Sequence, residues 1–458
     1  MFVHHMMDVR PTSKREHVAS ILAIASGETS MRRTTVVIAA LGSCASIVSA
    51  SAWANGMTER VSVSSAGTQG NDFSEVFGGI SADGRYVTFD SGATNLVPGD
   101  TNALGDVFVR DRSTGQTTLV SVSKGGVQSD SYGSTISADG RFVAFRSRST
   151  NLLPGNPIGF EQAYVVDRKT GNLRRASVSA SGTAADTNTS DAMISADGRY
   201  VGFDSFAANL VSGDTNDTAD VFVHDMSTGK TSRVDVGPNG VECASGASGF
   251  ALSVDARFVA FNSSCTSLLP GGSQGGIQTF LRDRQIGRSY LVSVGPGGVE
   301  ANGIAIVSAV SPDGRLVSFN SSATNLVPGV TNGEVQVYIR DRKTGTTELE
   351  SVGVGGVQGD GFSSGGGMSA DGRYVAFVSR ATNLVADDTN GQFDTFVHDR
   401  LTGKTYRVSV GPSGVQANGD SFGHALTANG LTAVFFSDAS NLVAGDTNGQ
   451  SDVFVHTR

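Results

Sequence analysis

Short apolar runs separated by glycine- and aspartate-rich turns recur along the chain in a pattern that repeats seven times. Each copy carries Ser-Ala-Asp-Gly-Arg or a variant of it, and the aspartate position returns after 56 residues once and after 58 residues in every later copy. A repeat of this length, with several strand-like runs and almost no helical periodicity, is typical of a propeller blade. The pattern predicts an all-β fold, a seven-bladed β-propeller of four-stranded antiparallel blades. The aspartate positions are Asp83, Asp139, Asp197, Asp255, Asp313, Asp371 and Asn429.

The positions shared by the copies predict the core. Asp-Gly between two apolar runs favours a hairpin, because glycine accepts a positive φ and the aspartate side chain can bond the turn backbone. Phenylalanine follows the aspartate position by six residues in every copy, and valine follows it by four in six copies. These two positions share one face of a strand, so we expect them to fill the contact between neighbouring blades. The phenylalanines are Phe89, Phe145, Phe203, Phe261, Phe319, Phe377 and Phe435.

The two ends of the repeat region predict how the ring closes. After the hairpin, each copy has another apolar run, a Thr-Gly or similar turn and a segment such as Leu-Val-Ser-Val-Ser, which we assign to the third and fourth strands. Residues 60–64 have this fourth-strand sequence with no blade before them, and the last copy ends in a third strand at residues 453–456. We expect the N-terminal strand to complete the last blade, which removes free sheet edges.

The repeat resembles a known group of proteins. Ser-Ala-Asp-Gly-Arg-Tyr-Val-Ala-Phe at residues 369–377, and Val-Phe-Val-His-Asp followed by Thr-Gly, are similar to the WD40-like repeat called PD40 that is found in TolB-like proteins. The resemblance covers about residues 60–458 and implies a propeller. Such repeats occur in translocation proteins, peptidase propellers and lyases, so the resemblance implies no single function. TolB resembles a six-bladed propeller with a separate domain, and the seven copies here depart from it.

The segment before the repeats has the pattern of a secretory signal. Residues 31–54 contain Arg32-Arg33, an apolar stretch and the small-residue sequence Ala52-Trp53-Ala54, as signal peptidase requires. We therefore divide the chain into an upstream extension (1–30), a signal peptide (31–54) and the propeller (55–458), located in the periplasm or outside the cell. A lipoprotein box at residues 41–44 is the alternative. No membrane span is expected in the mature chain.

Charge and cysteine content narrow the class of protein. The net charge is −9, and removing residues 1–54 leaves 29 Lys and Arg against 40 Asp and Glu, or −11. This balance argues against a nucleic-acid partner. Cys243 and Cys265 remain, on either side of the Asp255 hairpin, and in an oxidising compartment this placement favours a disulfide. Two unpaired thiols are the alternative.

The loop between the second and third strands contains candidate metal ligands. Four copies have Asp-x-Asn-x-x-x-Asp, whereas the other three lack both acids and end in Gln162, Gln278 and Gln336. Because paired carboxylates repel each other unless a cation lies between them, this joint loss makes weakly bound calcium a candidate. The favoured interpretation is a set of turns that Asp and Asn stabilise through their own backbone bonds. The candidate ligands are Asp100, Asn102, Asp106, Asp214, Asn216, Asp220, Asp388, Asn390, Asp394, Asp446, Asn448 and Asp452.

Other polar positions suggest chemistry but fit structural roles. One residue near the end of the third strand is basic in six copies, and we expect it to form a solvated face paired with the adjoining Asp111, Asp225 or Asp399. His424 is expected on an inner strand, where one histidine makes no metal site. Two Gly-x-Ser-x-Gly sequences, at 361–365 and 419–423, have no helix after them and so fit repeat glycines rather than a nucleophile. The third-strand residues are Arg110, His224, Arg282, Arg340, His398 and His456.

Two classes of function remain. The first is a monomeric, secreted or periplasmic, calcium-stabilised binding scaffold that holds a protein, peptide or glycan without transforming it. The second is a propeller enzyme such as a polysaccharide lyase, because some lyases resemble seven-bladed propellers with a metal held by histidines near the axis. After the signal segment, His224, His398, His424 and His456 remain, and one of them is expected near the axis. That count favours the binding scaffold.

Overall fold

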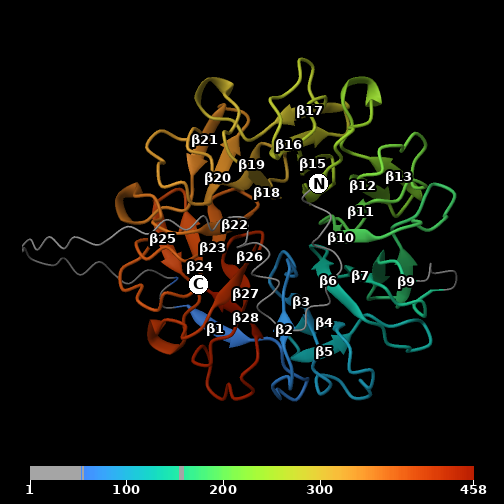
Figure 1. Ribbon diagram of the computed structural model, residues 1–458. Coiled ribbons are helices and arrows are strands. Elements are labelled where there is room, and N and C mark those ends of the chain that lie inside the picture. Colours follow the sequence, from blue (N-terminus) through green and yellow to red (C-terminus); the bar gives the residue numbers. More distant parts are fainter. Residues whose placement is uncertain (1–52, 54–55, 154–158) are drawn as a thin grey trace, which may run out of the picture. The chain divides into compact units, whose positions relative to one another are not determined.

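The computed structural model describes residues 53, 56–153 and 159–458. Within them, 28 strands form seven four-stranded antiparallel sheets, arranged around a ring (Figure 1). The predicted seven-bladed fold is confirmed. The upstream extension and nearly all of the signal segment lie outside the described residues. No helix in the described part of the chain is long and apolar enough to cross a membrane.

Each blade has an inner strand, a second, a third and a fourth strand in that order. The inner strands are β2 (Ser74–Glu75), β6 (Ser131–Ile136), β10 (Thr189–Ile194), β14 (Ser248–Leu252), β18 (Ala305–Val310), β22 (Ser363–Met368) and β26 (Ser421–Leu426). The second strands are β3 (Tyr86–Ser91), β7 (Phe142–Ser147), β11 (Tyr200–Ser205), β15 (Phe258–Ser263), β19 (Leu316–Ser321), β23 (Tyr374–Ser379) and β27 (Thr432–Ser437).

The third and fourth strands follow the same order. The third strands are β4 (Asp106–Asp111), β8 (Gln162–Asp167), β12 (Asp220–Asp225), β16 (Gln278–Asp283), β20 (Gln336–Asp341), β24 (Asp394–Asp399) and β28 (Asp452–Thr457). The fourth strands are β5 (Gln116–Leu119), β9 (Asn172–Arg175), β13 (Lys230–Arg233), β17 (Arg288–Leu291), β21 (Thr346–Leu349), β25 (Lys404–Arg407) and, for blade seven, β1 (Met57–Arg60). Single 3-10 turns lie at Pro238–Gly240, Pro296–Gly298, Val354–Gly356 and Pro412–Gly414.

The Asp-Gly turn between the inner and second strands is held by its own side chains. In blade one the Ser81 hydroxyl donates to Asp83 Oδ1 (2.7 Å) and accepts from the Tyr86 N–H (2.9 Å). The Arg85 N–H donates to the same carboxylate oxygen (3.0 Å), and Gly84 has φ +76°. The predicted structural role of this aspartate is confirmed.

The core lies between the blades, as the phenylalanine and valine positions predict. Each second-strand phenylalanine stacks on an aromatic ring of the third strand of its own blade, with centroids 5.6–5.9 Å apart. In blade one, Val87 and Phe89 are fully buried and share a cluster with Val434 and Val453 of blade seven. The pairs are Phe89–Phe108, Phe145–Tyr164, Phe203–Phe222, Phe261–Phe280, Phe319–Tyr338, Phe377–Phe396 and Phe435–Phe454.

Ring closure by the N-terminal strand is confirmed, but the pairing begins earlier than predicted. Strand β1 pairs with β28 in the register Met57↔Thr457 to Arg60↔Phe454, and Figure 1 shows the two side by side. Residues 61–64 follow the strand: the Val61 N–H still bonds the Val453 carbonyl, and Val63 then bridges to Gln69. The Val-Ser-Val-Ser segment was misassigned because its alternating pattern also fits the short hairpin that leads to the next inner strand.

Candidate functional site

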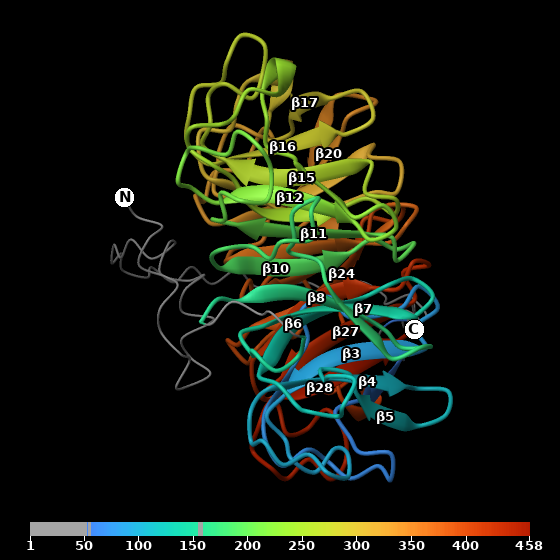
Figure 2. The ribbon, with the colours of Figure 1, turned by 90° about the vertical axis from the view of Figure 1, so that its right-hand side faces the viewer.

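Two groups of loops gather at one end of the blades, which we call the loop face. They are the loops between second and third strands and the segments that lead from a fourth strand to the next inner strand. Hydrogen bonds join the two groups, for example from the Thr215 N–H to Glu242 (2.9 Å) and from Gln128 to the Gly99 carbonyl (3.1 Å). In the side view the strands lie one above another, with loops on either side (Figure 2). The predicted acid loops belong to the loop face.

In blades six and seven the paired acids of this loop enclose an arginine. Arg407 Nη1 lies 3.5 Å from both Asp388 and Asp394. Arg60 Nη1 lies 3.6 Å from Asp446 and 3.3 Å from Asp452. A glutamine amide also donates to both acids in each blade: Gln416 in blade six and Gln69 in blade seven. The cation between these carboxylates is therefore a guanidinium from the last residue of the fourth strand.

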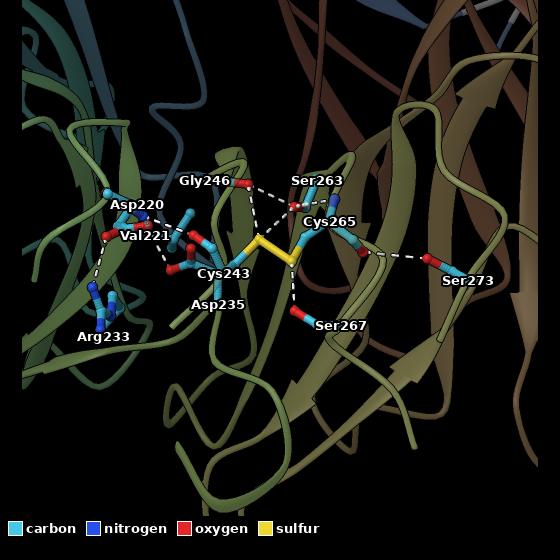
Figure 3. Close-up of a disulfide and its surroundings, with 11 residues drawn as sticks. Asp220, Val221, Arg233, Asp235, Cys243, Gly246, Ser263, Cys265, Ser267 and Ser273 are labelled. Carbon is cyan, nitrogen blue, oxygen red and sulfur yellow. Dashed lines mark hydrogen bonds and ion pairs between the residues drawn. A yellow bond between two sulfur atoms is a disulfide. The ribbon is translucent and has the colours of Figure 1, made fainter. Parts of the chain in front are cut away.

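Blade three brings three carboxylates together. The side-chain oxygens of Asp214, Asp220 and Glu242 lie within 4.8 Å of one another, a spacing that could hold a metal ion. Arg233 Nη1 lies among them, 3.5 Å from Asp214, 3.0 Å from Asp220 and 2.5 Å from Glu242. Figure 3 shows the guanidinium directed at Asp220. Burial and the neighbouring Asp220 charge raise the pKa of Asp214 to about 6 against the opposing effect of Arg233.

The copies that lack the acids need no cation. Gln336 accepts from the Ser351 hydroxyl (2.6 Å) and donates to the carbonyls of Gly359 and Gly361 (both 3.1 Å). Gln162 and Gln278 have equivalent bonds. A neutral amide thus provides both the acceptor and the donor that the site requires. Glutamine thus replaces the second acid of the pair without leaving a buried charge.

Blade one keeps both acids but not the arginine. Leu119 ends its fourth strand, at the place that Arg233 and Arg407 occupy in their blades. The Ser121 hydroxyl donates to Asp106 Oδ1 (2.7 Å), as Ser409 does to Asp394. Asp106 is fully buried, and its Oδ2 has no hydrogen-bond partner. Burial raises the pKa of Asp106 to about 7.

The predicted asparagine ligands hold the turn of the loop. Asn102 Oδ1 accepts from the Leu104 N–H (3.2 Å), and Asn216 and Asn390 make the same bond. In blades three and six the amide nitrogen faces the aspartate: Asn216 Nδ2 lies 3.2 Å from Asp220 Oδ1, and Asn390 makes the equivalent bond to Asp394. Asn448 Nδ2 donates to the Gly70 carbonyl (2.9 Å).

The basic residues of the third strands do not form a solvated face, which corrects our expectation. His224, His398 and His456 are buried, and each Nδ1 is 2.8–2.9 Å from a fourth-strand threonine hydroxyl. That hydroxyl bonds a valine carbonyl of the preceding blade, as Thr405 does with Val352. Arg110, Arg282 and Arg340 bond the equivalent Thr or Ser. Burial lowers the pKa of His224 and His398 to about 4.

The aspartates that follow the basic residues of the third strands pair with the arginine after the Asp-Gly turn. Asp111 accepts from Arg85 Nε (2.9 Å) and Nη2 (2.7 Å), and five further blades repeat the pair from the Ser-Ala-Asp-Gly-Arg arginine. This bidentate contact holds the pKa of Asp111 well below its usual range. The sequence contained the signal, because both residues recur 26 positions apart, but spacing alone did not show that they meet.

The inner strands of blades six and seven begin beside a row of aromatic rings. Phe362 and Phe393 have centroids 6.0 Å apart, Phe393 and Phe422 5.2 Å, and Phe422 and Phe436 5.5 Å. Phe393 is buried, whereas the other three rings are half-buried. The exposed Arg380 places its guanidinium 5.1 Å from the Phe393 centroid. We call these five residues the aromatic row. Sequence reasoning missed it because its five members come from five separate segments of the chain.

Blade two has a polar cluster on its inner and second strands. Arg146 pairs with Glu161 (2.8 Å) and lies 4.8 Å over the Tyr132 ring, whose hydroxyl donates to Glu161 (2.6 Å). Nearby, Asp90 of blade one accepts from the Ser134 hydroxyl (2.7 Å) and the Gly133 N–H. Burial raises the pKa of Asp90 to about 7. These contacts join blades one and two through the bulge of β6.

The remaining candidates are structural. The serines of the two Gly-x-Ser-x-Gly sequences, Ser363 and Ser421, are buried and bond second-strand serines. His424 packs against the neighbouring inner strand, where a Cβ at Gly365 would lie 2.9 Å from its ring. The predicted disulfide between Cys243 and Cys265 is present, with a Cα–Cα distance of 5.9 Å, and Figure 3 shows it in blade four.

Comparison with known proteins supports the fold. No family model and no curated protein matches the chain. Among solved structures, oligogalacturonate lyase from Vibrio parahaemolyticus is similar over 88% of this chain and 97% of its own, with 12% identity and a TM-score of 0.51. The β-propeller domain of the Trilobed protease from Pyrococcus furiosus is similar over 84% and 95%, with 10% identity and a TM-score of 0.51.

TolB from Acinetobacter baumannii is a more distant structural match. It is 13% identical over 82% of this chain and 81% of its own, with a TM-score of 0.38. The two proteins matched with a TM-score of 0.51 are thus an enzyme and the propeller domain of a protease. At these identities the comparisons establish a β-propeller, and they assign it no activity.

Proposed function

We propose that this protein is a non-catalytic binding scaffold that works outside the cytoplasm and holds a peptide, protein or glycan on its loop face. The aromatic row is the observation that carries this proposal. Half-buried rings offer a rigid surface for apolar groups or sugar rings, and aromatic residues and arginine dominate binding energy at interfaces. Arg380 adds a positive charge for an acidic group on the ligand.

The histidine contacts support binding rather than lyase chemistry. A lyase site that uses histidines to hold a metal requires them to converge. His224, His398 and His456 lie in three different blades, each bonded to its own threonine. His424 lies on an inner strand, and burial lowers its pKa.

The disulfide and the burial of Trp53 support secretion with a specific cleavage position. Trp53 is fully buried, stacks on His456 (5.9 Å) and offers its carbonyl to His456 Nε2 (2.8 Å). Cleavage after Ala54 would remove this side chain. Cleavage after Ala52 also follows a small-x-small sequence, with Ala50 three residues before the cut. The mature chain then begins at Trp53, which the mass of the exported protein would test.

The binding proposal is tested by screening the exported protein against glycan and peptide arrays. Phe422→Ala should weaken binding of any ligand found by about 1–2 kcal/mol, or roughly 5- to 30-fold. Leu401→Ala is the matched control, because Leu401 is 74% exposed in the turn after a third strand, away from the loop face. Binding that depends on Leu401 and not on Phe422 would reject the assignment. Conversion of a uronate polymer to an unsaturated product would instead support a lyase.

A further inference from the structure

We propose that Asp100 and Asp106 of blade one bind a hard divalent cation, calcium. The ion would lie at the place that a guanidinium occupies in blades three, six and seven. The inference does not depend on the partner of the loop face. It starts from the pairing between the acid loop and the end of the fourth strand. In the blades whose fourth strand ends in Arg60, Arg233 or Arg407, the loop carries both acids. In the blades whose fourth strand ends in Leu291 or Leu349, a glutamine replaces the second acid.

Two blades depart from this pairing. Blade two has Gln162 with Arg175, and this arginine lies over the Tyr164 ring. Blade one has Asp100 and Asp106 with Leu119. Among the four blades with both acids, blade one is therefore the one whose described contacts provide no guanidinium for the pair.

The loop of blade one is built like the others. Its asparagine closes the same turn, and its serine binds the same aspartate oxygen. The difference lies at the second oxygen. Asp394 Oδ2 receives the Gln416 amide (3.0 Å) and lies 3.5 Å from Arg407. Asp394 Oδ2 also receives the Asn390 amide (3.2 Å). In blade one the Gln128 amide donates to Gly99 and Asp100 instead, and Asp106 Oδ2 and the neighbouring Asn102 Nδ2 are both buried without a hydrogen-bond partner.

A buried carboxylate oxygen without a partner is costly, and a second carboxylate nearby adds repulsion. A cation at this point relieves both effects. Two carboxylates and water suit a hard, oxygen-seeking ion such as calcium. Asn102 keeps its oxygen in the turn, so Asp100 and Asp106 are the protein ligands. A site with so few protein ligands should have a Kd of about 0.1–1 mM, the range of weak extracellular calcium modules.

The test is calorimetric titration of the chelator-treated, full mature chain with calcium chloride and, separately, magnesium chloride. We expect one calcium per chain, and a rise in Tm of about 2–3 °C at ~10 mM calcium. A stronger response to magnesium would support the cation site and reject calcium as its ligand. Four equivalents per chain would overturn the assignment to blade one, because the arginines would then have been displaced. No heat and no Tm shift would overturn the site.

Two arginine exchanges make the test specific. Leu119→Arg should place a guanidinium between Asp100 and Asp106 and abolish calcium binding while the protein stays folded. Arg407→Leu combined with Gln416→Ala, which removes both the guanidinium and the amide from Asp394 Oδ2, should open a second site in blade six and raise the stoichiometry to two. Leu291→Arg is the control for adding arginine where no acid pair exists, and it should leave calcium binding unchanged. Asp106→Asn should lose the ion without adding a charge. Calcium binding that survives both Leu119→Arg and Asp106→Asn would overturn the proposal.

Discussion

Buried carboxyl groups are stabilised in different ways at equivalent positions of the repeat. Asp394 and Asp452 face a guanidinium, whereas the equivalent Gln336 avoids the charge altogether.

Asp90, at another position of the repeat, has two hydrogen-bond donors but no cation at bonding distance among its described contacts, so burial raises its pKa to about 7. The equivalent residue of blade four is Asn262, which accepts from the Val307 N–H of the next blade (2.7 Å). The chain itself therefore shows that an amide fits this position.

Asp90→Asn should change the pH dependence of stability. The pKa of Asp90 is 3.8 unfolded and about 7 folded, so the folded state holds the proton more tightly. The stability that protonated Asp90 contributes to the folded state is complete below about pH 4 and is lost as pH rises through about 7. Urea unfolding at pH 5 and pH 8, in chelator, should show wild type losing roughly 2–4 kcal/mol more than the variant across this range. Equal losses would show that Asp90 does not titrate there.

At the scale of elements, the sequence predicted the strands better than the partners of their side chains. The period revealed the hairpins, because Asp83 and Gly84 act within one turn. The histidine contacts were missed because Thr405 lies on another strand and Val352 lies in the segment after β21 of the preceding blade, and linear spacing does not show which segments meet. The arginine of the acid site was also missed, although Asp220 and Arg233 are 13 residues apart and Asp394 and Arg407 repeat that spacing.

The disulfide should be stabilising but dispensable for the fold. Cys243 and Cys265 occupy positions that hold Ala417 and Ala439 in blade seven, so Cys243→Ala with Cys265→Ala should fold with the same strands. The bond closes a loop with a sequence separation of 22, and its loss should cost about 3 kcal/mol. Chemical unfolding of the double variant measures this cost. An unfolded double variant, or one as stable as wild type, would contradict this assignment.

At the scale of the whole molecule, closure by β1 protects the edge of β28. Removal of residues 53–61 would expose that edge and the cavity left by Trp53. We expect a loss of roughly 5 kcal/mol from the buried apolar surface, which lowers Tm by about 5 °C or more. The exposed strand should also promote association. A monomeric truncated chain with unchanged Tm would show that the ring does not depend on this strand.

Binding without chemical change is the central functional claim, and the state of a bound ligand tests it most directly. A ligand found by array screening should be incubated with the purified protein, recovered from the complex and compared by mass spectrometry with the starting material. We predict an unchanged mass, recovered with wild type and the Leu401→Ala control and strongly reduced with Phe422→Ala. Cleaved or eliminated products that require the protein would contradict the account.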